Sequence, residues 1–110
     1  MNFDEYQSKT QETAIYPEQG KLGGLIYAAL GLGEAGEIQN IIKKILRDDN
    51  GIVSKEIKEK IVYELGDLLY YCARMAKELN FNFDTIAQMN LNKLKSRYER
   101  GTISGSGDTR

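Results

Sequence analysis

The chain contains a single proline, Pro17, and its apolar residues recur elsewhere at spacings of three and four. This is the repeat of one face of an α-helix, and no segment alternates apolar and polar residues as a half-buried strand would. The pattern predicts helices over residues 2–14, 21–47, 54–79 and 84–101, with residues 16–20 as a loop. We therefore predict an all-α fold, a bundle of four to five helices.

Short polar segments mark the expected ends of these helices. Asn2 and Ser54 stand where N-caps are expected, and residues 48–51 (Asp-Asp-Asn-Gly) are typical of a turn. Residues 48–51 lack the later ligands of a calcium loop, so we interpret them only as a turn. Glycines at positions 31, 33 and 36 predict a kink or break in the second helix. Residues 102–110 are small and polar and predict a flexible C-terminal arm.

The composition narrows the class of function. A length of 110 residues suits one domain, which we place at residues 1–101. Fifteen basic and sixteen acidic residues give a net charge of -1, without the basic excess of a nucleic-acid binder. No histidine is present, so the commonest general base and most zinc sites are excluded. Catalysis would have to use carboxylates, lysine, arginine, tyrosine or a metal.

The sequence shows no signal peptide and no apolar run long enough to cross a bilayer. Its only cysteine, Cys72, lies in an apolar stretch that is typical of a buried thiol. We expect no membrane partner and a cytoplasmic location, or the host cytoplasm if the gene belongs to a phage.

Two acidic pairs lie within the predicted helices. Glu34 and Glu37 form a Glu-x-x-Glu pair, and Glu64 and Asp67 form a Glu-x-x-Asp pair. A spacing of three places both carboxylates of a pair on one helix face. Each pair lies on or beside an apolar stripe, where unpaired carboxylates are rare because their desolvation is costly. If the stripes face each other, four carboxylates converge and need a cation, for which Mg²⁺ is the natural candidate (Mn²⁺ as a substitute).

The alternative is that these acids are solvated carboxylates paired with lysines. Glu56 and Glu59 have the same spacing but alternate with lysines, which is typical of a solvated face. The two candidate pairs instead lie among apolar residues and near Gly33, Gly36 and Gly66. Glycine inside a helix costs about 1 kcal/mol relative to alanine. These glycines therefore indicate a close approach of a helix or a ligand.

Further side chains are candidates for binding a substrate. Lys44 follows the first acidic pair, and Lys93 and Arg97 lie four apart in the last helix, so we predict that they contact phosphates. The alternative for them is a favourable charge near a helix C-terminus. Tyr70 and Tyr71 follow the second acidic pair and are candidates for stacking on a base, although packing in a core or interface is the commoner role.

Residues 33–37, 64–70 and 93–110, in this order, resemble the MazG-like, all-α nucleoside triphosphate pyrophosphohydrolases. The resemblance implies an oligomeric helical bundle, with a tetramer built from two dimers favoured over a dimer. It implies cleavage between the α and β phosphates, which releases a nucleoside monophosphate and pyrophosphate. It also implies Mg²⁺ at four residues: Glu34, Glu37, Glu64 and Asp67. Many relatives carry two adjacent glutamates where this chain has glycine and then Glu34, so the number of metal ions stays open.

The expected reaction is attack of water on the α phosphorus, with Glu37 and Glu34 as catalytic residues that orient the water or accept its proton. Its purpose would be to clean or bias the nucleotide pool. Two alternatives stay open. The same site could release phosphate stepwise from a dNTP or dNDP, such as dGTP. The chain could instead be a non-catalytic oligomer that binds a nucleotide or a protein, with its acidic pairs facing lysines. The preferred base and sugar are not readable from the sequence.

Overall fold

The computed structural model describes all 110 residues and contains helices but no strands. A short 3₁₀-helix, η1, spans Gln11–Thr13. The five α-helices are α1 (Phe3–Thr10), α2 (Leu22–Gly31), α3 (Glu34–Asp48), α4 (Lys55–Glu78) and α5 (Phe83–Glu99). The predicted all-α class is confirmed.

The ends of the helices follow the local chemistry of the sequence. The side chain of Asn2 accepts a hydrogen bond from the first turn of α1 at 2.8 Å, and that of Ser54 does the same for α4 at 3.2 Å. The turn after α3 contains Asn50 and Gly51, both with positive φ. The predicted break within residues 21–47 separates α2 from α3. The first helix is shorter than expected, because the chain tightens into η1 after Thr10.

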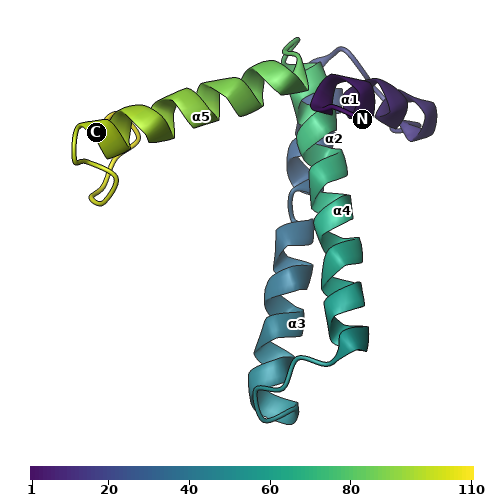
Figure 1. The fold of residues 1–110 in the computed structure, drawn as a ribbon. Helices are drawn as coiled ribbons and strands as arrows, with labels where there is room; N and C mark the ends of the chain where they lie inside the picture. Colours follow the sequence, from purple (N-terminus) through teal and green to yellow (C-terminus); the bar gives the residue numbers. More distant parts are fainter.

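Helix α4 organises the molecule. Its main contacts are with α3, α2 and α1, and α3 and α4 form a long hairpin (Figure 1). Helix α5 leaves the end of α4 at a wide angle and projects away from the hairpin (Figure 1). The radius of gyration is 16.9 Å, compared with about 13 Å for a compact domain of this length. The single chain is therefore more extended than a compact helical bundle of this length.

The core is small and lies where α1, α4 and α5 meet. Ala73 and Ala76 of α4 pack there with Phe83, and Cys72 is partly buried against them. Arg74 is the largest side chain that is fully buried. No helix combines the length and apolar content needed to cross a bilayer.

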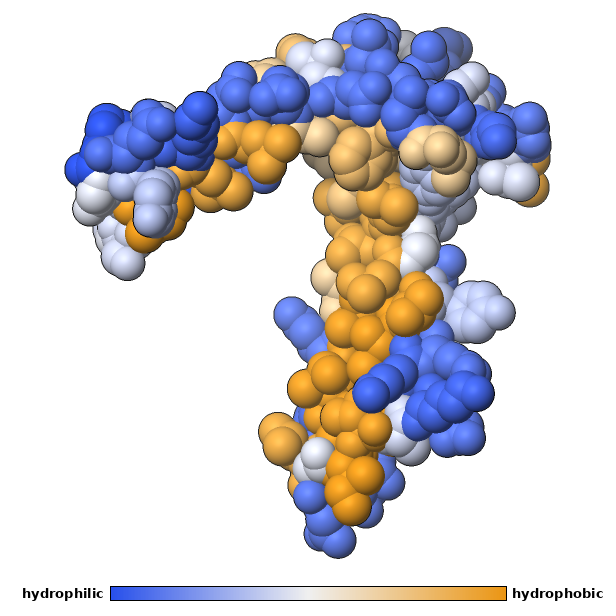
Figure 2. Space-filling model, viewed as in Figure 1, coloured by the Kyte–Doolittle hydropathy of each residue, from blue (hydrophilic) through white to orange (hydrophobic).

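Many large apolar side chains remain exposed. Figure 2 shows an apolar stripe that runs down the α3–α4 hairpin and continues along α5. Leu46, Val62 and Leu91 are 74%, 65% and 60% exposed. The accessible surface is 8051 Å², whereas a compact monomer of this mass would expose about 6,100 Å². The excess is explained by apolar faces that nothing in the single chain covers.

The C-terminal arm, residues 102–110, makes polar contacts with itself and with α5, and its flexibility stays a prediction. It turns back on the end of α5. The Arg110 side chain donates hydrogen bonds to the carbonyls of Thr102, Ile103 and Gly107. The Asp108 carboxylate accepts from α5 as well. The arm is held by polar contacts and glycine turns rather than by apolar burial, and hydrophobicity patterns do not register such contacts.

Candidate metal centre

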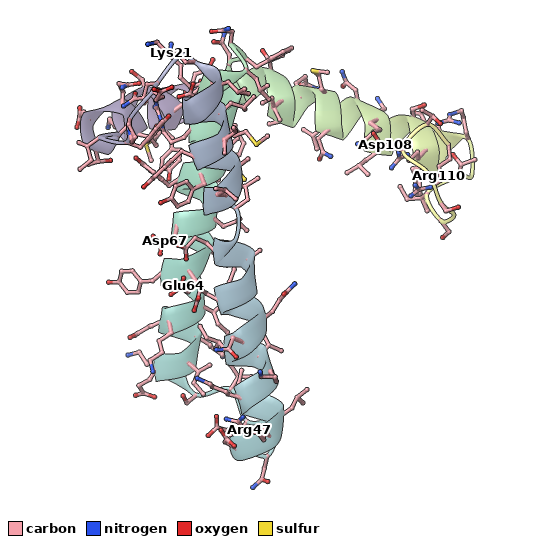
Figure 3. All side chains as sticks on the ribbon, turned by 180° about the vertical axis from the view of Figure 1, so that it is seen from behind. Lys21, Arg47, Glu64, Asp67, Asp108 and Arg110 are labelled. Atoms are coloured by element: carbon pink, nitrogen blue, oxygen red, sulfur yellow. The ribbon has the colours of Figure 1, made fainter.

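Carboxylates at the start of α3 and in the middle of α4 converge, and Figure 3 shows the two from α4, Glu64 and Asp67. One oxygen from each of Glu34, Glu64 and Asp67 lies within 4.8 Å of the other two. Glu34 is the first residue of α3, directly after the break from α2. Glu64 and Asp67 are three residues apart in α4, so they share a face that meets the start of α3. Three of the four predicted carboxylates are therefore brought together.

Glu37 lies at the edge of this carboxylate cluster. Its side chain is exposed, and it is not one of the three residues whose oxygens meet. Its charge nevertheless acts on the cluster. Burial is the main cause that raises the pKa of Glu64, and a hydrogen bond with Glu34 and the charges of Asp67, Glu34 and Glu37 raise that pKa further.

The carboxylate cluster has no cationic partner within the chain. The three ion pairs are Arg47 with Asp48, and Lys93 and Arg97 with Asp108. One oxygen of Glu64, Oε2, is buried with no hydrogen-bond partner. A buried, unpartnered carboxylate oxygen is costly, and three clustered carboxylates repel one another. An all-oxygen donor set with this need for positive charge fits a hard divalent cation such as Mg²⁺.

A cavity of about 460 Å³ opens beside the cluster. Glu34 and Asp67 line it together with four tyrosines and two further residues: Tyr16, Tyr27, Tyr70, Tyr71, Thr13 and Ile15. Tyr70 and Tyr71 meet edge to face, with ring centroids 5.2 Å apart. The two tyrosines singled out from the sequence thus share a cavity with two of the carboxylates.

Tyr16 and Tyr27 were missed by sequence reasoning. Tyr27 lies inside the apolar run of α2, where no motif distinguishes it. Tyr16 directly precedes Pro17 in the loop before α2, and an aromatic residue in an otherwise polar loop was the only available signal.

The glycine that permits a close approach is not among those expected. A Cβ at Gly31 would overlap the Tyr71 ring, so α2 and α4 can pack here only because residue 31 has no side chain. Nothing lies within 4 Å of a Cβ built at Gly36 or Gly66. The expected close approach at those two positions is therefore not made within a single chain.

The candidate phosphate ligands do not join the cluster in a single chain. Lys93 and Arg97 hold Asp108, which Figure 3 shows at the far end of α5, well away from Glu64 and Asp67. Arg97 is only 5% exposed, because the arm covers it. Lys44 is exposed on α3.

Comparison with known proteins gives two matches. A family model described as the MazG nucleotide pyrophosphohydrolase domain matches residues 25–102. The Gene 37 protein of Mycobacterium phage L5 is 48% identical over 114 aligned positions, which cover all of both chains. No solved structure matches this chain. The family match includes both acidic pairs and α5, whereas Tyr16 and most of the arm lie outside it.

Proposed function

Because the chain belongs to the MazG nucleotide pyrophosphohydrolase family, we propose that it hydrolyses nucleoside triphosphates to the monophosphate and pyrophosphate with Mg²⁺. The observation that carries this proposal is the convergence of Glu34, Glu64 and Asp67 without any cation of the chain. The reaction would clean or bias a nucleotide pool in the cytoplasm. The phage origin of its relative supports action in a host cytoplasm.

Glu34, Glu64 and Asp67 would hold the metal, with Glu37 as a further ligand. Bound there, Mg²⁺ (or Mn²⁺) supplies the positive charge that offsets the triphosphate and makes its anhydride easier to break. The unpartnered Oε2 of Glu64 supports this assignment, because coordination would satisfy an oxygen that no hydrogen bond reaches.

The remaining roles follow from position. Glu37, at the exposed edge of the cluster, would orient the attacking water or accept its proton, and Glu34 would assist it. Lys93 and Arg97 would steady phosphate oxygens as negative charge moves to the departing pyrophosphate, with Lys44 as a further contact. Tyr70 and Tyr71 would contact the base.

The distance between the end of α5 and the cluster in one chain favours phosphate contacts from the α5 of a second chain. We therefore propose a homo-oligomer, a tetramer built from two dimers, in which α5 of one copy serves the carboxylates of another. The surface exceeds that of a compact monomer by about 1,900 Å², and a standard interface covers about 800 Å² on each partner. The apolar stripe and the open glycines of α3 and α4 support such packing.

The deciding experiment is a hydrolysis screen over all standard and several modified triphosphates, with and without Mg²⁺, with products identified by ion chromatography. We expect Mg²⁺-dependent release of pyrophosphate. Release of orthophosphate would favour the stepwise alternative instead. No turnover of any nucleotide would overturn the proposal in favour of a non-catalytic oligomer.

A further inference from the structure

Two tyrosines without a role in the proposed function, Tyr16 and Tyr27, form one wall of the cavity beside the cluster. The rings of Tyr16 and Tyr27 stack almost in parallel, with centroids 4.9 Å apart and planes 8° apart. Tyr16 is 6% exposed and Tyr27 is 44% exposed. Tyr27 also lies against Tyr71, at 6.5 Å between ring centroids. The buried ring of Tyr16 thus supports a ring that faces the cavity.

The end of α4 holds Tyr16 in place. The Tyr16 hydroxyl donates to Glu78 at 2.7 Å and accepts from Nε of Arg74 at 3.3 Å. The Arg74 guanidinium also lies 5.7 Å from the centre of the Tyr16 ring. The second oxygen of Glu78 accepts from the backbone N–H of Gly20, at 2.9 Å. The whole loop before α2 is therefore fastened to α4 through Tyr16 and its two partners.

Burying the charged side chain of Arg74 costs hydration free energy. It is 1% exposed, and besides Tyr16 it donates only to neutral acceptors, Oγ1 of Thr10 and Oε1 of Gln11. A buried cation without a paired carboxylate loses hydration that neutral acceptors only partly replace. An apolar side chain of similar volume would often serve stability as well or better. The geometry of Arg74 instead specifies where η1 and Tyr16 lie.

We propose that Tyr16 and Tyr27 form the stacking wall of a nucleobase pocket, and that Arg74 is the positioning residue for this wall. The pocket is continuous with the carboxylates, since the same cavity is lined by Glu34 and Asp67. The inference rests on the proposed function for the triphosphate end of the substrate. It adds the site that binds the nucleobase and identifies Arg74 as the residue that positions the wall of this site.

The lining of the pocket also indicates the class of base that it accepts. Apart from the two carboxylates, the side chains that line it offer aromatic faces, one aliphatic group and hydroxyls. No amide and no cation is present to read the edge of one particular base. Stacking is tolerant of base identity, and pockets that do not read a substrate by hydrogen bonds discriminate only about 10- to 200-fold. The pocket therefore accepts several bases.

The first test measures base binding without the reaction. The chain has no tryptophan, and four of its seven tyrosines line this cavity, so a base bound there should change the tyrosine fluorescence. Titrations use dAMP, dGMP, dCMP and dUMP in EDTA, with equilibrium dialysis as a second measurement. We expect all four to bind within about 200-fold of one another. Tyr27→Ala should weaken binding by roughly 5- to 150-fold, the usual effect of losing one stacking partner.

The matched control is Tyr63→Ala, which removes a tyrosine of α4 that is 79% exposed and does not line the cavity. Its affinities should equal those of the wild type. Equal loss in both variants, or no loss in Tyr27→Ala, overturns the pocket assignment. A preference above about 10³-fold for one base overturns the inference of a broad substrate class, because it would require hydrogen-bond readout.

The second test isolates Arg74. Arg74→Met removes its hydrogen bonds, and Tyr16→Phe keeps the stacked ring but removes the hydroxyl that contacts Arg74 and Glu78. Both variants should raise KM several-fold at nearly unchanged kcat, and Arg74→Lys should recover part of the change. A merely structural role would lower the melting temperature and leave KM unaltered. If Arg74→Met does not fold, Tyr16→Phe decides the question, and an unchanged KM there refutes the positioning role.

Failure of this inference is distinguishable from failure of the proposed function. If nucleoside monophosphates bind in a manner that depends on Tyr27 but no nucleotide is hydrolysed with Mg²⁺, the pocket assignment holds and the proposed hydrolysis is wrong. Turnover that is indifferent to Tyr27 and Tyr16 would do the reverse.

Discussion

The start of α3, beside the middle of α4, and the end of α5 both carry clustered charges, but only the cluster at α5 contains charges of both signs. In the hairpin, Glu34, Glu64 and Asp67 meet without a cation from the chain. At the end of α5, Lys93 and Arg97 meet a carboxylate from the arm, that of Asp108, and form ion pairs at 2.9 and 3.0 Å. The carboxylates of the first region therefore need a cation from outside the chain, whereas the charges of the second region are paired within the chain.

This difference has a consequence for catalysis. A triphosphate at the hairpin brings more negative charge to a region that is already negative, so positive charge must come from a metal and from other cations. The cations best suited for this lie at the end of α5, and one of them, Arg97, is covered by the arm. The four predictions that follow test whether the two regions work together, and they run from the largest expected effect to the smallest.

Neutralising the cluster should abolish activity and relieve repulsion at the same time. Asp67→Asn and Glu64→Gln should each lower kcat by about 10³-fold or more, because metal charge stabilisation is worth several kcal/mol. Glu64→Gln should also raise the melting temperature of the metal-free protein, since it removes a carboxylate whose charged form is disfavoured there. Steady-state kinetics and calorimetry in EDTA measure the two effects.

Glu59→Gln is the matched control for these variants, because it removes a carboxylate of α4 that lies outside the cluster. It should change neither property. A Glu64→Gln protein that keeps its activity would remove the metal assignment.

Mixing two inactive variants tests whether α5 acts on another copy. Arg97→Ala should lower kcat/KM by about 10²- to 10³-fold, as loss of a transition-state donor does. If the two regions meet across chains, co-refolding Arg97→Ala with Asp67→Asn rebuilds one intact site in each mixed dimer. The mixture should then recover about a quarter of the wild-type rate, since half of the dimers are mixed and have one of two sites intact.

Each variant refolded alone is the control for the mixing experiment. No recovery, although mass spectrometry of the intact oligomers shows both variants in one oligomer, would mean that each chain uses its own α5. It would then follow that α5 moves toward the hairpin in solution.

Two glycines of the site region should respond to alanine with opposite signs. Gly31→Ala places a Cβ in the Tyr71 ring and should destabilise the protein by about 1–3 kcal/mol, as overpacking does. It should also weaken nucleotide binding, because Tyr71 lines the pocket. Gly66→Ala meets nothing within the chain and should stabilise α4 by up to about 1 kcal/mol. Urea unfolding measures both.

The sign of the stability change in Gly66→Ala also tests the packing of a second copy against α4. A destabilised oligomer in Gly66→Ala would show that a second copy packs closely against α4 at this point. Stabilisation would indicate that the position faces solvent or the substrate.

The smallest effect concerns the pH dependence of the arm. Hydrogen bonds from Lys93 and Arg97, together with their charges, hold the pKa of Asp108 below its ordinary value. A carboxyl with a lowered pKa in the folded protein adds stability above its ordinary pKa of about 3.9, and this stability is lost as the pH falls through the lowered value. Amide exchange at Arg110, whose backbone N–H donates to the carbonyl of Gly107, should therefore rise only below about pH 4.

Asp108→Asn should make that exchange fast already at neutral pH, whereas Asp48→Asn, at the end of α3, should leave it unchanged. If exchange in the arm is insensitive to both pH and Asp108→Asn, the ion pairs do not hold the arm.

Local features of the fold were readable because their causes lie within a few residues. The caps at Asn2 and Ser54 depend on an oxygen side chain placed before a helical run. The stop at Gly101 depends on a residue that tolerates positive φ. The break between α2 and α3 depends on a cluster of glycines. Helix propensity also placed each acidic pair on a single helix face.

The sequence by itself thus determined the helices, most of their ends and the family, since each depends on local chemistry or on motifs in order. Only the tertiary structure decided that Glu34 meets Glu64 and Asp67 while Glu37 stays at the edge. It also decided that Gly31 is the point of closest approach, and that Tyr16 and Tyr27 complete a pocket. These features depend on how two helices rotate and cross when they pack, and helical periodicity describes each helix alone.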